Sequence, residues 1–282
     1  HGLHAAGGGA KPVGGEAAGE VVALGPDVSG WSVGDRVMGR CPGAFAEYAL
    51  MNQAEALPMA PTQSWAEAAA IPLTFLVTFD MLVLQGRLQA GDTLLIAGVS
   101  SGVGVSSLQA AKAMGVKVIG TSGSAEKLQR LKALGLEVGL HTRQPDFHAA
   151  VMEATQGKGV QLAIDTVGGS VFAECMRCLG FEGRLAMVGY VDGVLNATID
   201  LEMLHAKRLA LFGVSNKLRT PAQRAQALPR FKAEWLPWFH SGQIRPVVDA
   251  VYPFDELQAA REAMEGSRHL GKLVLEGWPD ED

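Results

Sequence analysis

Apolar residues follow two different patterns along this chain, and the change comes near Asp92. In residues 1–60, short alternating runs such as Glu20–Leu24 and Ala44–Leu50 are separated by glycine-rich turns. Alternation with a period of two predicts half-buried strands, so this part is expected to form a small β-domain. After Asp92, continuous apolar runs alternate with segments of helical spacing, which predicts a doubly wound parallel sheet of the α/β class.

The second pattern gives a regular series of elements. Strands are predicted at Thr93–Ala97, Val116–Thr121, Val138–His141, Val160–Asp165, Arg184–Val188 and Leu209–Val214. Helices are predicted after Gly104 and at Ala125–Leu134, Phe147–Thr155 and Ser170–Leu179. Outside this series we expect a helical segment at 61–84 with Trp65 and Phe75 facing inward, a long helix at Pro221–Ser241, and strands at Val247–Tyr252 and Leu273–Leu275.

A glycine-rich turn stands between the first two strands of this series. It contains Gly98, Ser100, Ser101, Gly102 and Gly104, and a helical segment follows directly. Strand, glycine turn, helix and strand within about 30 residues form a unit whose helix N-terminus offers free N–H groups to a pyrophosphate. The turn is a variant of G-x-G-x-x-G, a pattern that also occurs in plain strand–helix turns. Because the flanking strand and helix are both present, we favour a dinucleotide-binding site.

The end of the second strand indicates which dinucleotide binds. Proteins that bind NAD place an acidic residue about 20 residues past the glycines, where it contacts the ribose 2′-OH. Here residues 121–127 read TSGSAEK, with no carboxylate at the strand tip. Ser122, Ser124 and Lys127, joined by Arg143, suit a 2′-phosphate, so NADPH is the predicted cofactor. Glu126, which speaks against this choice, stands in the first turn of the predicted helix, where it complements the helix dipole. A lysine on a solvated helix face is the alternative for Lys127.

Composition and charge narrow the function classes. The net charge of −5 gives no electrostatic argument for binding nucleic acid or an anionic membrane, and no run of 18 apolar residues predicts a membrane span. Three cysteines in 282 residues favour a reducing, cytoplasmic setting over a disulfide framework. Residues 1–12 lack the apolar stretch of a signal peptide, and the absence of an initial Met suggests a fragment.

Two of the cysteines, Cys175 and Cys178, form a C-x-x-C pair. One such pair cannot complete a four-ligand zinc site. The surrounding segment is predicted to be helical, which places both thiols on one face, one turn apart. Buried structural thiols are the favoured interpretation, and redox chemistry is the alternative.

Several motifs, taken in order, resemble the medium-chain dehydrogenase/reductase superfamily. Residues 15–22 (GEAAGEVV), 33–37 (VGDRV) and 43–48 (GAFAEY) are similar to its GroES-like catalytic domain. Residues 101–104 (SGVG), 120–124 (GTSGS), 165–169 (DTVGG) and 271–275 (GKLVL) continue the match. The group that the chain resembles most is the zinc-independent quinone oxidoreductases.

The resemblance implies two domains. A GroES-like, mainly β catalytic domain is expected at 1–70 and 246–282, and a Rossmann dinucleotide-binding domain at 71–245. The first strands of the family should precede His1, so the catalytic domain is expected to be incomplete at its N-terminus.

Zinc ligands of the superfamily have no counterparts in this sequence. Zinc-dependent alcohol dehydrogenases carry G-H-E, whose histidine binds the metal, and a four-cysteine lobe. Here the triplet is Gly14-Gly15-Glu16, and Cys41 is the single cysteine before residues 43–48. None of the seven histidines has a His or Cys partner at i+4. No metal site is predicted, and Glu16 is expected to be a packing or hydrogen-bonding residue.

The resemblance also implies where the nicotinamide lies. In the family, the strand ends that match Asp165–Val167, Gly189–Tyr190 and Val214–Asn216 face that ring. The full predicted cofactor set is Ser100, Ser101, Gly102, Val103, Gly104, Thr121, Ser122, Ser124, Lys127, Arg143, Thr166, Val167, Gly189, Tyr190, Val214, Asn216 and Lys272. Tyr190 is the candidate for a donor or stacking residue at the substrate, and an aromatic residue that merely lines the cleft is an equal alternative. No general acid is predicted.

Without a metal to stabilise an alkoxide, the expected substrate is an electrophile that accepts hydride unaided: a quinone or an α,β-unsaturated carbonyl. An enoyl-thioester reductase is one alternative. It needs a basic groove, for which Arg219, Arg224 and Arg230 are candidates although their spacing does not align them on one helical face. A crystallin-like protein that binds NADPH without turnover is the other alternative. Finally, the apolar strand Leu209–Val214 ends the predicted sheet, and an unprotected edge of this kind predicts a homodimer.

Overall fold

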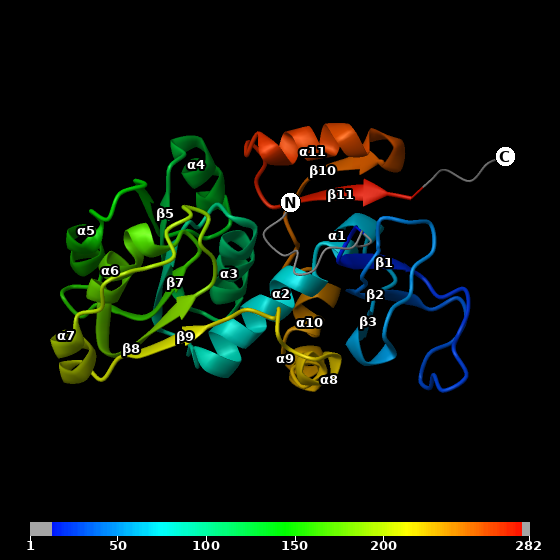
Figure 1. Ribbon diagram of the computed structural model, residues 1–282, viewed down its shortest axis with the longest axis horizontal. Helices are drawn as coiled ribbons and strands as arrows, with labels where there is room; N and C mark the ends of the chain where they lie inside the picture. Colours follow the sequence, from blue (N-terminus) through cyan, green and yellow to red (C-terminus); the bar gives the residue numbers. More distant parts are fainter. Residues whose placement is uncertain (1–12, 278–282) are drawn as a thin grey trace. The chain divides into compact units, whose positions relative to one another are not determined.

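The computed structural model describes residues 13–277 and divides into two compact units (Figure 1). One unit combines the chain up to Leu76 with the chain from Asn216 onward, and the other is Val77–Ser215. By contacts, residues 216–245 therefore belong with the two ends of the chain, whereas the sequence-based division grouped them with the dinucleotide-binding part. That division into functional domains stays a prediction.

The expectation that residues 1–12 are not a signal peptide concerns residues that the structure does not describe. Within residues 13–277, no helix is both long and apolar enough to cross a membrane.

Val77–Ser215 is built on a six-stranded parallel sheet with the strand order β6-β5-β4-β7-β8-β9. The strands are β4 (Thr93–Ala97), β5 (Lys117–Ser122), β6 (Val138–His141), β7 (Val160–Asp165), β8 (Leu179–Met187) and β9 (Ala210–Gly213). The first strand in sequence lies in the middle and the two halves extend outward from it, which confirms the doubly wound Rossmann arrangement. β8 begins five residues before the predicted start, Arg184, and β9 forms the edge of the sheet.

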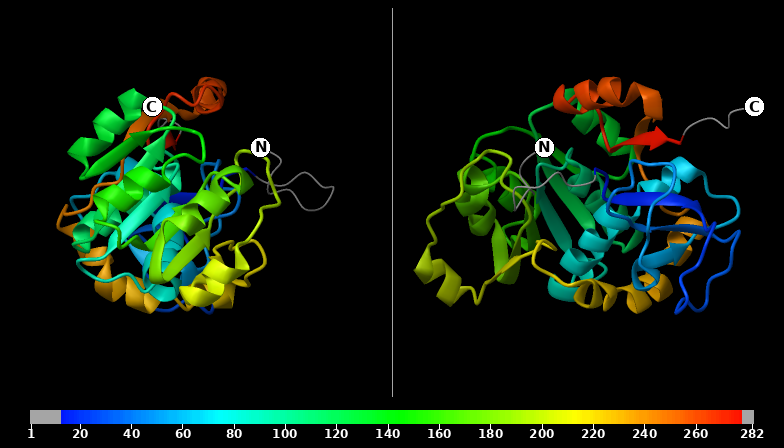
Figure 2. Two further views of the ribbon diagram at one scale, coloured as in Figure 1. Left: turned by 90° about the vertical axis from the view of Figure 1, so that its left-hand side faces the viewer. Right: turned by 45° about the vertical axis from the view of Figure 1, so that its right-hand side comes forward.

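Helices cover both faces of this sheet (Figures 1 and 2). They are α3 (Gly102–Ala113), α4 (Ala125–Ala133), α5 (His148–Ala154), α6 (Gly169–Arg177) and α7 (Leu201–Ala206). α5 and α6 lie on one side of the strands and α3 on the other. Leu95 and Ala163 of the sheet and Cys175 of α6 are fully buried members of one core cluster.

The C-x-x-C pair belongs to this core. Cys175 and Cys178 are both free and have no exposed surface, which confirms the interpretation of buried structural thiols. Burial raises the pKa of Cys178 to about 12 and also raises the pKa of Cys175. Because only the thiolate is a good nucleophile, both side chains are chemically inert.

The predicted helical segment at 61–84 forms three pieces: α1 (Trp65–Ala69), α2 (Pro72–Phe79) and a π-helical turn, η2 (Asp80–Gln85). Phe75 faces the core as predicted, but Trp65 does not, since it is 42% exposed. The reason is a surface contact: the guanidinium of Arg36 lies 4.1 Å from the centre of the Trp65 ring.

In the other unit, β1 (Glu16–Glu20), β2 (Arg36–Arg40) and β3 (Ala56–Pro58) form an antiparallel sheet, with η1 (Gln53–Glu55) before β3. β10 (Val248–Pro253) and β11 (Lys272–Glu276) form a parallel pair, joined through η3 (Phe254–Glu256) and α11 (Leu257–Glu265). The predicted strand Ala44–Leu50 does not form. Tyr48 and Leu50 are 74% and 92% exposed, so the alternation there marks no buried face.

The predicted long helix at Pro221–Ser241 is divided into α8 (Pro221–Ala225), α9 (Leu228–Glu234) and α10 (Leu236–His240). Pro229 and Pro237 stand within the first two residues of α9 and α10. Proline has no N–H to donate to the preceding turn, so each one starts a new helix. The aromatic side chains still pack together: Phe75 and Phe239 meet edge to face with ring centres 4.8 Å apart.

Candidate functional site

The turn between β4 and α3 needs glycine at two positions for different reasons. Gly98 has a φ of +80°, and a Cβ there would collide with the Thr166 hydroxyl. At Gly104 a Cβ would lie 2.6 Å from the Gly98 carbonyl oxygen, so a side chain would push α3 away from the strand. Ser101 starts the helix, because its hydroxyl accepts a hydrogen bond from the Gly104 N–H at 3.0 Å.

Gly102 leaves the start of α3 open. No protein atom lies within 4 Å of the position that its Cβ would occupy. The N–H groups of Gly102 and Val103 find no acceptor in the part of the chain that the structure describes. Together with the positive end of a 12-residue helix, these free donors form a ready site for an anion.

The carboxyl ends of the neighbouring strands lie beside this turn. The Thr166 hydroxyl donates to the Ala97 carbonyl at 2.9 Å, and the Ser101 hydroxyl donates to Thr166 at 3.3 Å. Gly189 donates its N–H to the Asp165 carbonyl, and Val214 donates its N–H to Met187. The predicted residues at the ends of β7, β8 and β9 therefore lie together at the carboxyl ends of the strands.

Asp165 begins one of the segments that are expected to face the nicotinamide, although the predicted cofactor set does not include it. Its side chain is fully buried, and Oδ1 accepts the N–H groups of Val167 at 2.8 Å and Gly168 at 2.9 Å. Oδ2 has no hydrogen-bond partner among the described residues. Burial raises the pKa of Asp165 to about 6, against the lowering effect of the two backbone donors. The sequence signal for it was an acidic residue at the last position of an apolar strand.

The tip of β5 carries hydroxyl groups, and the side chain of Arg143, which follows β6, lies beside it. The hydroxyls of Ser100 and Ser122 lie 2.9 Å apart, and Ser122 also accepts the Ser124 N–H. Ser124 caps α4 by accepting the Lys127 N–H at 3.2 Å. Arg143 packs directly against Gly123, where a Cβ would lie 2.6 Å from its Cγ. A side chain at position 123 would displace the arginine from this place.

Two of the predicted cofactor residues belong to the other unit. The Lys272 ammonium pairs with the Glu16 carboxylate, whose second oxygen accepts the Leu73 N–H at 2.7 Å. Glu16 thus has the hydrogen-bonding role expected of it. The Asn216 side chain accepts a hydrogen bond from Arg219 at 3.3 Å. All other predicted cofactor residues lie in Val77–Ser215, with Tyr190 half exposed.

The side chains that could bind a metal ion lie apart from one another within residues 13–277. No group of three or more His, Cys, Asp or Glu side chains is placed to hold a metal ion there. Gly15, at the position of the family's histidine ligand, approaches the Leu73 side chain. Cys41 is buried, and its thiol donates to the Leu50 carbonyl.

Comparison with known families matches both parts of the chain. Residues 5–61 match the alcohol dehydrogenase GroES-like domain, and residues 102–233 match the family of zinc-binding dehydrogenases. The chain is 33% identical over 267 residues to the spectinabilin polyketide synthase system protein NorB of Streptomyces orinoci, covering 94% of this chain and 12% of NorB. It is 28% identical to a quinone oxidoreductase-like protein 2 homolog of Nematostella vectensis, of which it covers 72%, and 92% of this chain is matched. The chain thus spans only about a tenth of the length of polyketide synthases such as NorB.

Solved structures share the fold over nearly the whole chain. A mycobacterial protein in complex with NADPH has a TM-score of 0.83 at 28% identity, covering 94% of this chain and 82% of that one. A probable oxidoreductase from Mycobacterium abscessus has a TM-score of 0.80 at 31% identity, with 93% and 79% covered. The CurK enoyl reductase has a TM-score of 0.78 at 26% identity, with 93% and 78% covered. From these matches and the two-part fold, the chain belongs to the medium-chain dehydrogenase/reductase superfamily of oxidoreductases.

Proposed function

We propose that this chain binds NADPH at the β4–α3 turn and transfers hydride, without a metal, to quinones or α,β-unsaturated carbonyls. The observation that carries the proposal is the tip of β5, where Arg143 packs on Gly123 beside the Ser122 hydroxyl. An NAD-binding protein would place a carboxylate at this tip. The NADPH bound to the mycobacterial structural relative supports the same choice of cofactor.

The turn residues fit the diphosphate part of such a cofactor. The open space in front of Gly102 admits phosphate oxygens, and the free N–H groups of Gly102 and Val103 are the donors that they need. Gly98 and Gly104 keep the turn and helix close together, so these donors are held in place before any ligand arrives.

Arg143 and Lys127 are the candidates for the 2′-phosphate. Arg143 is exposed, and Lys127 lies in the first turn of α4, where the helix N-terminus also favours an anion. A charge-assisted hydrogen bond is worth about 1.5–3 kcal/mol, and solvent exposure lowers that figure. Two such contacts should favour NADPH over NADH by about 10- to 100-fold.

The remaining residues at the carboxyl ends of the strands bind and orient the reactants. When bound, NADPH supplies the hydride. Asp165 holds the N–H groups of Val167 and Gly168, which fixes the turn after β7, and Tyr190 offers a half-exposed hydroxyl as a donor. Quinones and conjugated carbonyls delocalise the charge that they receive, so water can supply the proton without a metal.

The full chain tests this proposal in a steady-state assay with NADPH and NADH against a panel of quinones and enones. Arg143→Met should raise KM for NADPH about tenfold and leave KM for NADH unchanged, because a single 2′-phosphate contact is lost. Lys127→Ala should act in the same direction. Lys132→Ala, at an exposed position near the other end of α4, is the control and should change neither constant. An equal loss with both cofactors would mean that Arg143 and Lys127 do not read the 2′-phosphate.

A second candidate, an enoyl-thioester reductase, is favoured by the similarity to polyketide synthases and to the CurK enoyl reductase. The three arginines predicted for a carrier groove do not support it. Arg224 is only 15% exposed and pairs with Glu55 at 2.7 Å, and Arg230 pairs with Glu234 at 2.7 Å. Arg219 donates to the Gln223 carbonyl and the Asn216 side chain.

One assay separates the candidates. Oxidation of NADPH with crotonyl-CoA at a far higher kcat/KM than with a quinone or a simple enone would establish the thioester reductase. Turnover of quinone or enone with no response to crotonyl-CoA would establish the leading proposal. NADPH binding without turnover of any of these would identify a non-catalytic binding protein.

A further inference from the structure

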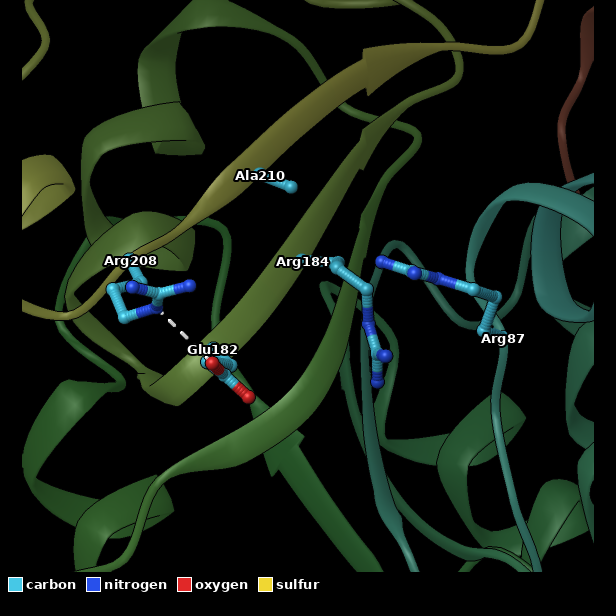
Figure 3. A pocket seen from close by; sticks show the side chains of 5 residues that line it. All are labelled: Arg87, Glu182, Arg184, Arg208 and Ala210. Carbon is cyan, nitrogen blue, oxygen red and sulfur yellow. Dashed lines mark hydrogen bonds and ion pairs between the residues drawn. The ribbon is translucent and has the colours of Figure 1, made fainter.

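A pocket of about 430 Å³ lies toward the amino ends of β8 and β9 (Figure 3), whereas the glycine turn follows the carboxyl end of β4. Arg87, Glu182, Arg184, Arg208 and Ala210 line it. Arg87 precedes β4, Glu182 and Arg184 belong to β8, and Ala210 begins β9. The proposed cofactor chemistry uses none of these residues.

Arg184 stands in an otherwise apolar row across the sheet. In the register it pairs with Leu162 on one side and Ala210 on the other, and Leu162 is fully buried. Its Nε is buried without a hydrogen-bond partner among the described residues. Burial, reinforced by the charge of Arg87, lowers the pKa of Arg184, while Asp92 and Glu182 act in the opposite direction. A partly buried cation without a direct partner is costly unless an anion accompanies it.

The acidic group of the pocket is already engaged. Glu182 accepts a hydrogen bond from Arg208 at 3.1 Å, and both side chains are largely exposed, so the pair itself adds little stability. Within residues 13–277, Arg87 and Arg184 form no ion pair and donate no side-chain hydrogen bond. Figure 3 shows these two side chains side by side, away from the Glu182–Arg208 pair.

Backbone strain gathers at the same place. Arg87, Glu182 and Arg208 have φ values of 48°, 56° and 53°, and they are three of the five described non-glycine residues with positive φ. This conformation costs a residue with a Cβ about 1–2 kcal/mol, whereas glycine adopts it freely. Strain that persists around one pocket, at positions that all carry charged side chains, points to a use for those charges.

We propose that Arg87 and Arg184 bind a phosphate group of a small-molecule ligand in this pocket. Guanidinium groups match phosphate oxygens with pairs of parallel hydrogen bonds. A phosphate with a charge of about −1.5 to −2 neutralises the two cations that lack a partner. The volume is within the range of small-molecule sites.

Inorganic phosphate is the probe. It is titrated into the full chain by calorimetry and by thermal unfolding, with chloride keeping the ionic strength constant. At about 20 times its dissociation constant, phosphate should raise the unfolding temperature of a chain of this size by about 3 °C. No effect beyond that of chloride would overturn the proposal.

Four variants locate the binding site. Arg184→Met and Arg87→Gly should each lose one bound phosphate per chain and the part of the thermal shift that this phosphate causes, and glycine at position 87 keeps the left-handed turn. Gln156→Gly relieves the same strain (φ 53°) at a turn outside the pocket, and it should keep the response. Arg143→Met should also keep it, because it alters only the proposed cofactor site. A response that Arg143→Met removes, or that both pocket variants keep, would place the phosphate elsewhere.

Glu182→Gln should change the affinity for phosphate in the opposite direction. It removes the one carboxylate that lines the pocket, so phosphate should bind several-fold more tightly. Weaker binding in this variant would show that Glu182 helps to form the site and would contradict the charge argument.

Discussion

The two ends of the six-stranded sheet in Val77–Ser215 present positive charge in different ways. At the carboxyl ends, the donors are free backbone N–H groups at Gly102 and Val103, and the nearby side chains are mostly hydroxyls. At the amino ends, the donors are the side chains of Arg87 and Arg184, which stand without carboxylate partners among the described residues. The first site needs the space that the missing side chain of Gly102 leaves, and the second site needs the guanidinium groups of Arg87 and Arg184. Adding a side chain should therefore damage the first site, and removing a side chain should damage the second.

Adding a side chain at Gly102 should have the largest effect. In Gly102→Val the new side chain fills the space in front of the N–H groups, so NADPH should bind at least about 100-fold more weakly. The fold should survive, because no protein atom lies within 4 Å of the new Cβ. Fluorescence titration with NADPH measures the first effect and circular dichroism the second.

Gly19→Val is the matched control for that experiment, since its Cβ position on β1 is equally open. It should bind NADPH as the unaltered chain does. Micromolar binding retained by a folded Gly102→Val protein would show that the turn is not the cofactor site and would remove one side of the comparison.

Asp165 gives the carboxyl ends a pH dependence. Its pKa rises from 3.8 to about 6 on folding, so the folded chain holds this proton more tightly than the unfolded chain. The resulting contribution to stability is fully present below pH 3.8 and is lost as the pH rises to about 6. It amounts to at most about 3 kcal/mol.

Urea unfolding between pH 4 and pH 7 compares the unaltered chain with Asp165→Asn, which cannot titrate at this position. The difference in unfolding free energy between the two proteins should change by up to about 3 kcal/mol across this range. A constant difference would show that Asp165 is ionised throughout.

β9 is the outermost strand of the sheet, and we propose that two chains form a homodimer through this strand. We expect light scattering at micromolar concentration to give twice the chain mass of 29.7 kDa. Gly213→Lys adds a charge at an exposed position of this edge and should weaken association by about tenfold. Gly19→Lys places the same charge on β1 and should leave the mass unchanged. A monomer before any substitution would refute the dimer.

The smallest expected effect separates the backbone strain at Arg87 from the charge repulsion between Arg87 and Arg184 at the amino ends of the strands. Without phosphate, Arg87→Gly should stabilise the chain by up to about 1 kcal/mol, because it relieves a left-handed arginine and its repulsion with Arg184. Gln156→Gly relieves the strain alone, so it should stabilise less. If denaturant unfolding gives equal gains, the two arginines do not repel each other measurably.

The same contrast explains what could be predicted from the sequence. All six strands of the parallel sheet were predicted, and the signal is clearest in the central strands β4 and β7, which are mostly apolar because both of their faces are buried. The glycine turn was equally visible, since Gly98, Gly102 and Gly104 are close neighbours in sequence. The failures at Ala44–Leu50 and Trp65 have a common cause: apolar spacing there does not mark a face that another element covers.

The amino-end pocket could not be predicted in this way. Arg87 and Arg184 are far apart in sequence and come together because β4, β7 and β8 are neighbours in the sheet, and the pairing of β8 with β9 adds Arg208 to the same pocket. The burial of Asp165 depends in the same way on the elements packed around it, although its place at a strand end was visible. The division of Pro221–Ser241 into three helices is a different case, because Pro229 and Pro237 are sequence signals from which it could have been predicted.

The burial of the three cysteines has a practical consequence. Cys41, Cys175 and Cys178 are all free and buried, and burial raises the pKa of each thiol. Maleimides and similar reagents attack exposed thiolates, so the natural side chains should react slowly. A cysteine introduced at an open position such as Gly19 would then be the one fast-reacting thiol, and a spectroscopic label attached there would report on that position alone.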